Sequence, residues 1–233
     1  MPTITYEERR GQLETYFDRT AVDAWSRLTS DAPVGRIRAT VRAGRADMRR
    51  ALLDWLPSDL SGRRLLDAGC GTGALAVEAA RRGANVVAVD ISPRLVALGR
   101  ERAPRSLGGG TVEYLVGDML DPALGHFDHV VAMDSLVHYP TRDIVSVLAG
   151  LAARCETSLV FTFAPRTVAL SVMHAIGRLL PRGDRAPAIE PVAEATLRRL
   201  LAGHAELQPW QAARSARITR GFYISQALQL VRR

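Results

Sequence analysis

The sequence LLDAGCGTGA, residues 65–74, joins a short apolar run to the start of a helical pattern. Its glycines, Gly69, Gly71 and Gly73, permit a tight turn that brings the backbone close to a ligand. The N-terminus of the following helix offers N–H groups and the positive end of a dipole. Gly69, Gly71 and Ala74 also satisfy the dinucleotide pattern G-x-G-x-x-G/A, which is weak evidence by itself. The stretch predicts a strand–turn–helix unit that holds a cofactor.

Downstream and upstream of this turn, apolar runs alternate with helical patterns. The apolar runs occupy residues 64–69, 85–90, 112–118, 127–135 and 158–165, and the helical patterns occupy 72–83, 92–103, 141–155 and 195–204. Continuous apolar strands that alternate with helices are typical of a parallel sheet covered on both faces. Two further strands in 206–233, joined tightly, would add an antiparallel edge. The prediction is a Rossmann-like, doubly wound, seven-stranded α/β sheet.

Two segments lie outside this alternation. Residues 6–56 have helical periodicity in two stretches, from Leu13 to Leu28 and from Ile37 to Leu56, and predict an N-terminal helical cap. Residues 166–192 contain a helical pattern followed by a loop rich in Pro, Gly and Arg, and predict an insertion over the carboxyl ends of the strands. We interpret residues 1–233 as one domain, with this insertion as a lid.

The basic residues of the chain are all arginine. Its 233 residues include 31 Lys and Arg, no lysine among them, and the formal charge is +7. Arginine forks favour acidic ligands, nucleic acid or an anionic membrane surface. Because the arginines are scattered, a GC-rich coding bias is the favoured explanation. Nucleic acid is disfavoured as a partner, since the sequence shows no basic-aromatic platform.

The two cysteines, Cys70 and Cys155, make neither metal-ligand spacing nor a disulfide framework, so we expect no metal site and a reducing cytoplasm. The N-terminus shows no apolar signal core, and no apolar run is long enough to span a bilayer. The net positive charge still permits peripheral attachment to a membrane.

Acidic residues end the first three predicted strands. Asp67 precedes the glycines, where it would repel a pyrophosphate but suit an ammonium group. Asp90 follows Gly71 by nineteen residues and can accept both ribose hydroxyls, and Asp118 stands where an adenine amino group would lie. This series resembles the class I S-adenosylmethionine-dependent methyltransferases. A turn without any cofactor and a nicotinamide-dependent oxidoreductase are the alternatives.

Further expected cofactor contacts lie next to the glycines and these acids, at Cys70, Ile91 and Met119. The backbone carbonyl of Asp134, after the fourth apolar run, is another. Each position also has a structural interpretation. Asp67 could cap the following helix, although the intervening glycines argue against it, and Ser92 is a better cap than Asp90 for the helix after it. Cys70 is a small turn residue rather than a nucleophile, because no neighbour in sequence would activate it.

A narrower resemblance covers nearly the whole chain, from Tyr16 to Arg232. The pieces are YFDRTAVDAW, IRATVRAG, LLDWL, LLDAGCGTG, DIS, LVHYP, FTFAPRT and FYIS, in this order. They resemble the magnesium-protoporphyrin IX O-methyltransferases of chlorophyll and bacteriochlorophyll synthesis. The resemblance implies methyl transfer to a porphyrin propionate, with a magnesium chelatase subunit upstream. It departs from the family at Thr29, near which relatives have a tyrosine, and at Arg45, where they have a histidine.

The resemblance also implies roles for individual residues. His138 is the acid/base or orienting candidate, against a capping or core role. Tyr139 lines the acceptor pocket or packs under the next helix. Tyr16 or Arg42 touches the methionine carboxylate. Arg166 clamps a propionate, and Met173 belongs to an apolar wall for the macrocycle. A methyltransferase acting on a quinone precursor and a non-catalytic porphyrin carrier are the competing functions.

Overall fold

The computed structural model describes residues 4–20, 35–166 and 188–233. Its centre is a seven-stranded sheet in the order β3-β2-β1-β4-β5-β7-β6. The strands are β1 (Arg64–Ala68), β2 (Asn85–Asp90), β3 (Thr111–Val116), β4 (Phe127–Ala132), β5 (Cys155–Phe163), β6 (Trp210–Arg220) and β7 (Tyr223–Arg232). Strand β7 is antiparallel to both of its neighbours, and the other adjacent strands pair in parallel. The predicted fold class and the antiparallel pair at one edge are confirmed.

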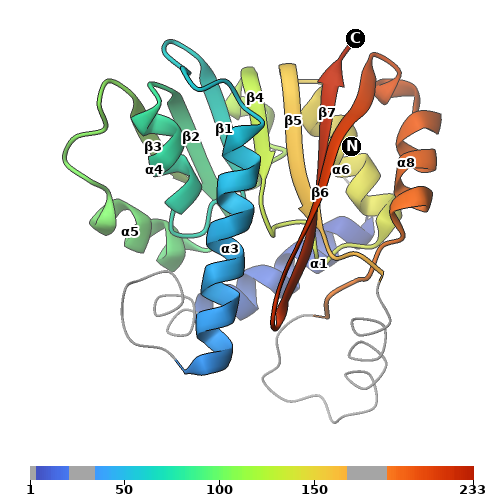
Figure 1. Ribbon diagram of the computed structural model, residues 1–233, viewed down its shortest axis with the longest axis horizontal. Helices are drawn as coiled ribbons and strands as arrows, with labels where there is room; N and C mark the ends of the chain where they lie inside the picture. Colours follow the sequence, from blue (N-terminus) through green and yellow to red (C-terminus); the bar gives the residue numbers. More distant parts are fainter. Residues whose placement is uncertain (1–3, 21–34, 167–187) are drawn as a thin grey trace.

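Helices cover both faces of this sheet (Figure 1). On one face lie α1 (Ile4–Thr15), α6 (Thr141–Ala152) and α8 (Glu194–Gly203), and on the other lie α3 (Arg36–Asp54), α4 (Ala74–Arg81) and α5 (Pro93–Arg102). Consecutive strand residues alternate between the two cores, as Leu65 and Leu66 of β1 do. Burial on both faces explains why the strands appear in the sequence as continuous apolar runs.

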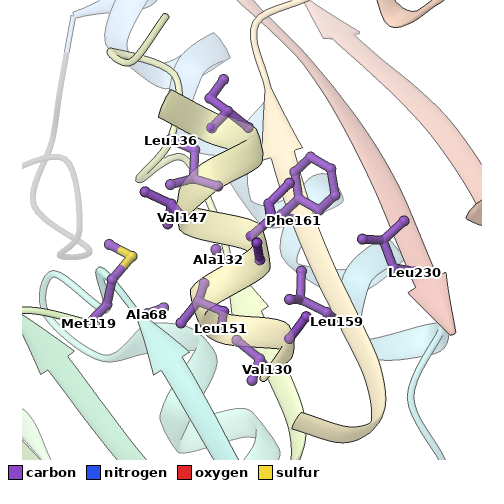
Figure 2. Close-up of a cluster of buried hydrophobic side chains, with 14 of the residues drawn as sticks. Ala68, Met119, Val130, Ala132, Leu136, Val147, Leu151, Leu159, Phe161 and Leu230 are labelled. Atoms are coloured by element: carbon purple, nitrogen blue, oxygen red, sulfur yellow. The ribbon is translucent and has the colours of Figure 1, made fainter. Parts of the chain in front are cut away.

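The core beneath α6 is built from apolar side chains of three elements. Figure 2 shows Val147 and Leu151 of α6 with Val130 of β4 and Leu159 and Phe161 of β5. The exposed fraction of each of these side chains is 1% or less. Burial of this extent stabilises the fold by about 1.5–3 kcal/mol for each large side chain. This packing fixes the carboxyl end of β4, from which the site extends.

The order of the strands reverses between β1 and β4. Strands β2 and β3 follow on one side of β1, and β5 follows on the far side of β4. In open α/β sheets the ligand lies outside the carboxyl ends of the strands at such a point. The glycine turn follows β1, and Asp134 follows β4, so both belong to this crevice.

The described part of the N-terminal segment is helical. Helix α1 begins at Ile4 and ends at Thr15, and a π-helical turn, Tyr16–Thr20, follows it. Residues 21–28 of the first predicted stretch lie outside the described residues. Helix α3 confirms the second stretch, but Ile37 is 56% exposed and does not belong to its buried face. The helix predicted from 168 to 180 lies outside the described residues.

Candidate active site

The glycine turn is held open by backbone geometry that side chains rarely adopt. Gly69, Gly71 and Gly73 have φ values of 81°, 56° and 76°. A Cβ on Gly69 would overlap the Ser135 side chain, and one on Gly73 would overlap Tyr114, whereas Gly71 faces open space. The first and third glycines therefore allow close packing, and the second leaves room for a ligand.

The N–H groups of the turn are already used within the protein. Gly69 and Cys70 both donate to the Val89 carbonyl, at 2.9 and 3.0 Å, and Gly73 donates to Cys70 at 2.9 Å. Gly71 donates to the Asp90 carboxylate at 2.8 Å. These bonds use donors of the turn itself, so a pyrophosphate would have to rely on the N–H groups at the start of α4, Ala74–Arg81. The availability of those helix N–H groups stays a prediction.

Asp67 lies beneath the turn, and its side chain both caps a helix and lines the cavity. Its carboxylate accepts a hydrogen bond of 3.1 Å from the Ala76 N–H in the first turn of α4. The capping role that the glycines argued against is therefore present. Burial raises the pKa of Asp67 to about 7, and the negative charge of Asp90 adds to this shift. The hydrogen bond from the Ala76 N–H and the charges of Arg45 and Arg49 oppose it. A bound cation would restore the ionised form.

Asp90 ends β2, as predicted, and its carboxylate faces the same cavity. It accepts from Gly71 N–H at 2.8 Å and from Ser92 N–H at 2.9 Å. Ser92, not Asp90, caps α5, since its hydroxyl accepts from Leu95. Burial is the main cause that raises the pKa of Asp90. Each carboxylate oxygen has two lone pairs, so Asp90 can still accept hydrogen bonds from a pair of hydroxyl groups.

Asp118 has partners that the sequence did not predict. Its carboxylate accepts from the Tyr6 hydroxyl at 2.7 Å, from Arg10 at 2.5 Å and from Leu120 N–H at 2.9 Å. Tyr6 also stacks on Tyr139, with ring centroids 5.1 Å apart. Gly117 and Met119 line the cavity, and Asp118 between them is not among the lining residues of the described chain. Helix α1 is therefore fastened to the third strand end.

Asp134 is the one described non-glycine residue with positive φ, at 57°. Its carboxylate forms an ion pair of 2.9 Å with Arg45 of α3. It accepts from the Tyr223 hydroxyl at 3.0 Å, and from Ser225 and Thr162 at 3.3 Å each. Its own N–H donates to the Thr162 hydroxyl at 2.7 Å. Side chains from three elements thus hold the turn after β4 in a strained conformation.

His138 and Tyr139 lie in the same turn region and both line the cavity. The His138 Nδ1 is 3.2 Å from the Ala188 carbonyl oxygen, and its ring is 6.0 Å from that of Phe17. Tyr139 is 2% exposed, so it both packs in the core and reaches the cavity. Its pKa lies well above the usual range, chiefly through burial.

One cavity of about 370 Å³ collects these groups, a volume within the range of roughly 300–1,000 Å³ that ligand pockets have. Among the predicted residues it is lined by Asp67, Gly69, Cys70, Gly71, Asp90, Ile91, Met119, Asp134, His138, Tyr139 and Arg42. Burial raises the pKa of the Cys70 thiol well above its ordinary value, which agrees with an inert thiol in the turn.

Two further predicted residues, Tyr16 and Arg166, are, like Asp118, not among the described lining residues. Tyr16 packs edge-on against Phe17 at 5.2 Å, and Phe17, not Tyr16, lines the cavity. Arg166 is exposed, its N–H donates to the Val192 carbonyl at 2.8 Å, and it is not among the lining residues that the structure describes. Met173 lies outside the described residues.

Sequence reasoning missed several lining residues, above all Tyr6, Leu13, Arg45, Arg49 and Ser135. The helical spacing of Arg42, Arg45 and Arg49 on α3 was the one available signal, because positions three and seven apart share a face. In the ranges that the structure describes, no group of three His, Cys, Asp or Glu side chains is arranged to hold a metal ion. None of the described helices combines the length and the apolarity needed to cross a membrane.

Comparison with known proteins assigns the class. Residues 65–157 match the family model described as a methyltransferase domain. A crystal structure of magnesium protoporphyrin IX methyltransferase from Synechocystis PCC 6803 with bound SAH aligns with a TM-score of 0.83 at 30% identity, covering 96% of this chain and 99% of that one. The fold, the open glycine turn and the acids at the strand ends are those of a class I S-adenosylmethionine-dependent methyltransferase.

The family follows from relatives of nearly equal length. Magnesium-protoporphyrin O-methyltransferase of Rhodobacter capsulatus is 50% identical over 225 residues, which are 96% of this chain and 97% of the relative. The protein of the same name from Synechocystis is 31% identical over 94% of this chain and 95% of the relative. Residues 132–232 match the model described as magnesium-protoporphyrin IX methyltransferase C-terminus. The chain belongs to the magnesium-protoporphyrin O-methyltransferase family, which favours this class over a nicotinamide-dependent oxidoreductase.

Proposed function

We propose that the protein transfers a methyl group from S-adenosylmethionine to a propionate carboxylate of magnesium protoporphyrin IX, giving the monomethyl ester in (bacterio)chlorophyll synthesis. The observation that carries the proposal is that His138 and the glycine turn line one cavity in a member of this family. The methyl donor and the acceptor can therefore meet beside one imidazole.

The cavity residues fit the methyl donor. Asp67, buried beneath the turn with a raised pKa, can accept from the ammonium group, and the open space at Gly71 admits the ligand next to it. Asp90 offers acceptors for the ribose hydroxyls, and Ile91 and Met119 offer apolar surface for the adenine. The expected carbonyl contact from Asp134 remains part of this proposal, as does a cofactor contact from Tyr16 once the N-terminal segment closes.

The reaction does not require a strong general base. When bound, S-adenosylmethionine supplies a methyl group on a cationic sulfur. A propionate has a reference pKa near that of Glu, about 4.3, so the acceptor is ionised at neutral pH. Charge is lost as the two react, and a cavity that excludes water favours the step. The main tasks of the protein are to align the carboxylate and to shield it.

The contact with Ala188 supports one tautomer of His138. A carbonyl oxygen can only accept, so the 3.2 Å contact requires the hydrogen to be on Nδ1. In the neutral ring the lone pair is then on Nε2. We infer that neutral His138 accepts the proton of an acid that enters un-ionised, whereas only the imidazolium can donate from Nε2 to a carboxylate. Ala188 belongs to the predicted 166–192 insertion, so the predicted lid would act directly on this histidine.

Contacts to the porphyrin come from three sources in this proposal. Tyr139 lines the cavity beside His138. Arg166 lies at the start of the insertion and is exposed, so it reaches a propionate only when the porphyrin extends out of the cavity. Met173 would supply apolar surface from the insertion. Closure of residues 166–192 over the macrocycle would bring these groups together.

We propose that the protein works in the cytoplasm at the surface of the photosynthetic membrane and receives its substrate from a magnesium chelatase subunit. Ile37 of α3 and Phe222 in the β6–β7 turn are 56% and 61% exposed. Gly221 lies against Thr40, so the turn and the start of α3 are neighbours (Figure 1). Exposed apolar side chains beside Arg36, Arg38 and Arg220 suit an anionic lipid surface.

Co-sedimentation with vesicles tests the membrane proposal. The protein should bind vesicles containing an anionic phospholipid more strongly than neutral ones, and Phe222→Ser should weaken this binding. Equal recovery of the protein and the Phe222→Ser variant with anionic vesicles would remove the support for this surface.

Incubation with methyl-labelled S-adenosylmethionine and magnesium protoporphyrin IX tests the reaction, with a quinone precursor as the competing acceptor. The labelled porphyrin monomethyl ester is the expected product. Labelling of the quinone precursor alone would assign the other acceptor class. Porphyrin binding without any labelled product, by protein that binds S-adenosylhomocysteine, would instead indicate a carrier.

A further inference from the structure

Arg45 has the strongest structural claim to a ligand among the residues that the sequence did not assign. Helix α3 runs very close to strand β7 at Gly44. A Cβ at this position would lie 2.5 Å from the Tyr223 ring. The next residue, Arg45, then points its guanidinium toward the turn after β4 and into the lining of the cavity. Its side chain is 22% exposed. The close approach at Gly44 thus sets the position of a cation inside the site.

Asp134 fixes the orientation of that cation. The ion pair of 2.9 Å joins one terminal nitrogen of Arg45 to a carboxylate whose side chain is only 10% exposed. Hydroxyl groups of Tyr223, Ser225 and Thr162 donate to the same carboxylate, so Arg45 is one of four donors to it. A guanidinium presents its N–H groups in a planar fork, and this geometry matches the two oxygens of a carboxylate.

Arg49, one of the other two cavity arginines, is less suited to this position. Arg49 donates to Glu78 at 2.6 Å, and Glu78 is not among the lining residues of the described cavity. The charge of Arg45 lowers the pKa of Asp67 and does so more than that of Arg49. Arg45 is therefore within electrostatic range of the acid beneath the glycine turn. The cavity therefore contains the carboxyl group of Asp67 and the guanidinium of Arg45, which interact electrostatically.

We propose that Arg45, oriented by Asp134, binds the α-carboxylate at the amino-acid end of the cofactor while Asp67 receives its ammonium group. A carboxylate and a guanidinium in one cavity match the ammonium and carboxylate groups of a zwitterionic α-amino acid. The fork of N–H donors on the guanidinium matches a carboxylate. The inference rests on the proposed function for its cofactor. It assigns to Arg45 the role that the sequence assigned to Arg42 or Tyr16.

Calorimetric titration of the full chain with two ligands tests the assignment without any methyl transfer. S-adenosylhomocysteine carries the amino-acid end, and 5′-methylthioadenosine lacks it. Arg45→Gln should weaken S-adenosylhomocysteine binding by about tenfold to a hundredfold, the loss of a charged hydrogen bond, and leave methylthioadenosine binding unchanged. Arg45→Lys keeps a positive charge beside Asp134, so its affinity for S-adenosylhomocysteine should lie between those of the unchanged protein and Arg45→Gln. This variant keeps the test valid if Arg45→Gln does not fold. Arg50→Gln is the matched control, an exposed arginine of α3 that pairs with Asp47.

The other outcomes each overturn the proposal. An equal loss of both ligands in Arg45→Gln and Arg45→Lys would make Arg45 a structural residue. A loss confined to Arg42→Gln would return the role to Arg42. Unchanged S-adenosylhomocysteine binding, with weaker binding of protoporphyrin IX but not of its dimethyl ester, would assign Arg45 to the propionate. Because these are binding measurements, they stand even where magnesium protoporphyrin IX proves not to be the acceptor.

Discussion

Tyr6 and Asp118, 112 residues apart in the chain, are joined by a hydrogen bond of 2.7 Å that fastens helix α1 to the end of strand β3. Arg10 reaches the same carboxylate, and Thr5 of α1 donates to Asp143 of α6 at 3.0 Å. Since Leu13 lies on the same helix and lines the cavity, α1 forms part of the wall of the site.

We expect Tyr6→Phe to destabilise the protein by about 1–2 kcal/mol, because it removes a hydrogen bond to a carboxylate and keeps the stacked ring. Tyr114→Phe is the matched control. In the described structure the buried Tyr114 hydroxyl has no hydrogen-bond partner, so its loss should be neutral or slightly stabilising. Urea unfolding measures both. A Tyr6→Phe cost no larger than that of Tyr114→Phe would show that the bond contributes nothing.

Gly69 and Gly71 of the turn should respond differently to substitution by alanine. Gly69→Ala places a methyl group on the Ser135 side chain at a φ of 81°, and we expect a loss of stability of several kcal/mol. Gly71→Ala meets open space, so we expect only the backbone cost of roughly 1–2 kcal/mol but a clear loss of S-adenosylhomocysteine affinity. Thermal unfolding and calorimetric titration separate the effects. Equal stabilities would contradict the packing at Gly69.

Asp67 should make cofactor binding depend on pH. Burial raises its pKa from 3.8 to about 7 in the free protein, with Asp90 adding to the shift and the Ala76 N–H, Arg45 and Arg49 opposing it. The folded chain therefore binds this proton more tightly than the unfolded chain, and the contribution of Asp67 to the free energy of unfolding falls as the pH rises from about 4 to about 7. An ammonium group in contact with Asp67 favours the ionised form, so binding releases the proton.

Titration of S-adenosylhomocysteine at pH 6.5 in buffers of different ionisation enthalpy measures this release. We expect a net release of protons for the protein itself and a much smaller release for Asp67→Asn. The same release in both would place the titrating group elsewhere in the cavity.

His138→Ala should lower turnover by about a hundredfold, the effect of losing the imidazolium that aligns the carboxylate, with little change in affinity for S-adenosylhomocysteine. His126→Ala is the matched control, since the His126 side chain is 70% exposed at the far end of β4. Single-turnover methyl transfer and ligand titration give the two readouts. Unchanged turnover in His138→Ala would leave this residue a structural role at the Ala188 contact.

Local patterns were sufficient to predict the sheet and half of the site. Burial on both faces requires apolar runs, so each of the five parallel strands between residues 63 and 164 was visible in the sequence. The acids that end β1 and β2 follow directly from those runs, and the parallel arrangement brings them to one edge. These residues reach the site through their own strand, which is why sequence position sufficed.

The contacts between distant elements could not be predicted in this way. The pairs Tyr6–Asp118 and Tyr223–Asp134 are separated by 112 and 89 residues, and no local period connects them. Asp118 was therefore expected to face the cofactor, and the partners it takes from α1 were not foreseen. Arg45 was noticed only as a departure from relatives, because its role depends on how closely Gly44 approaches Tyr223.

The position of β7 between β5 and β6 has a consequence for synthesis on the ribosome. Tyr223 and Ser225, two of the donors to Asp134, belong to this strand, and β6 reaches the sheet only through it. A nascent chain that has emerged only as far as β6 still exposes the edge of β5 and lacks Tyr223 and Ser225, two of the four donors to Asp134. The turn after β4 therefore gains its full set of contacts only after translation has passed β7.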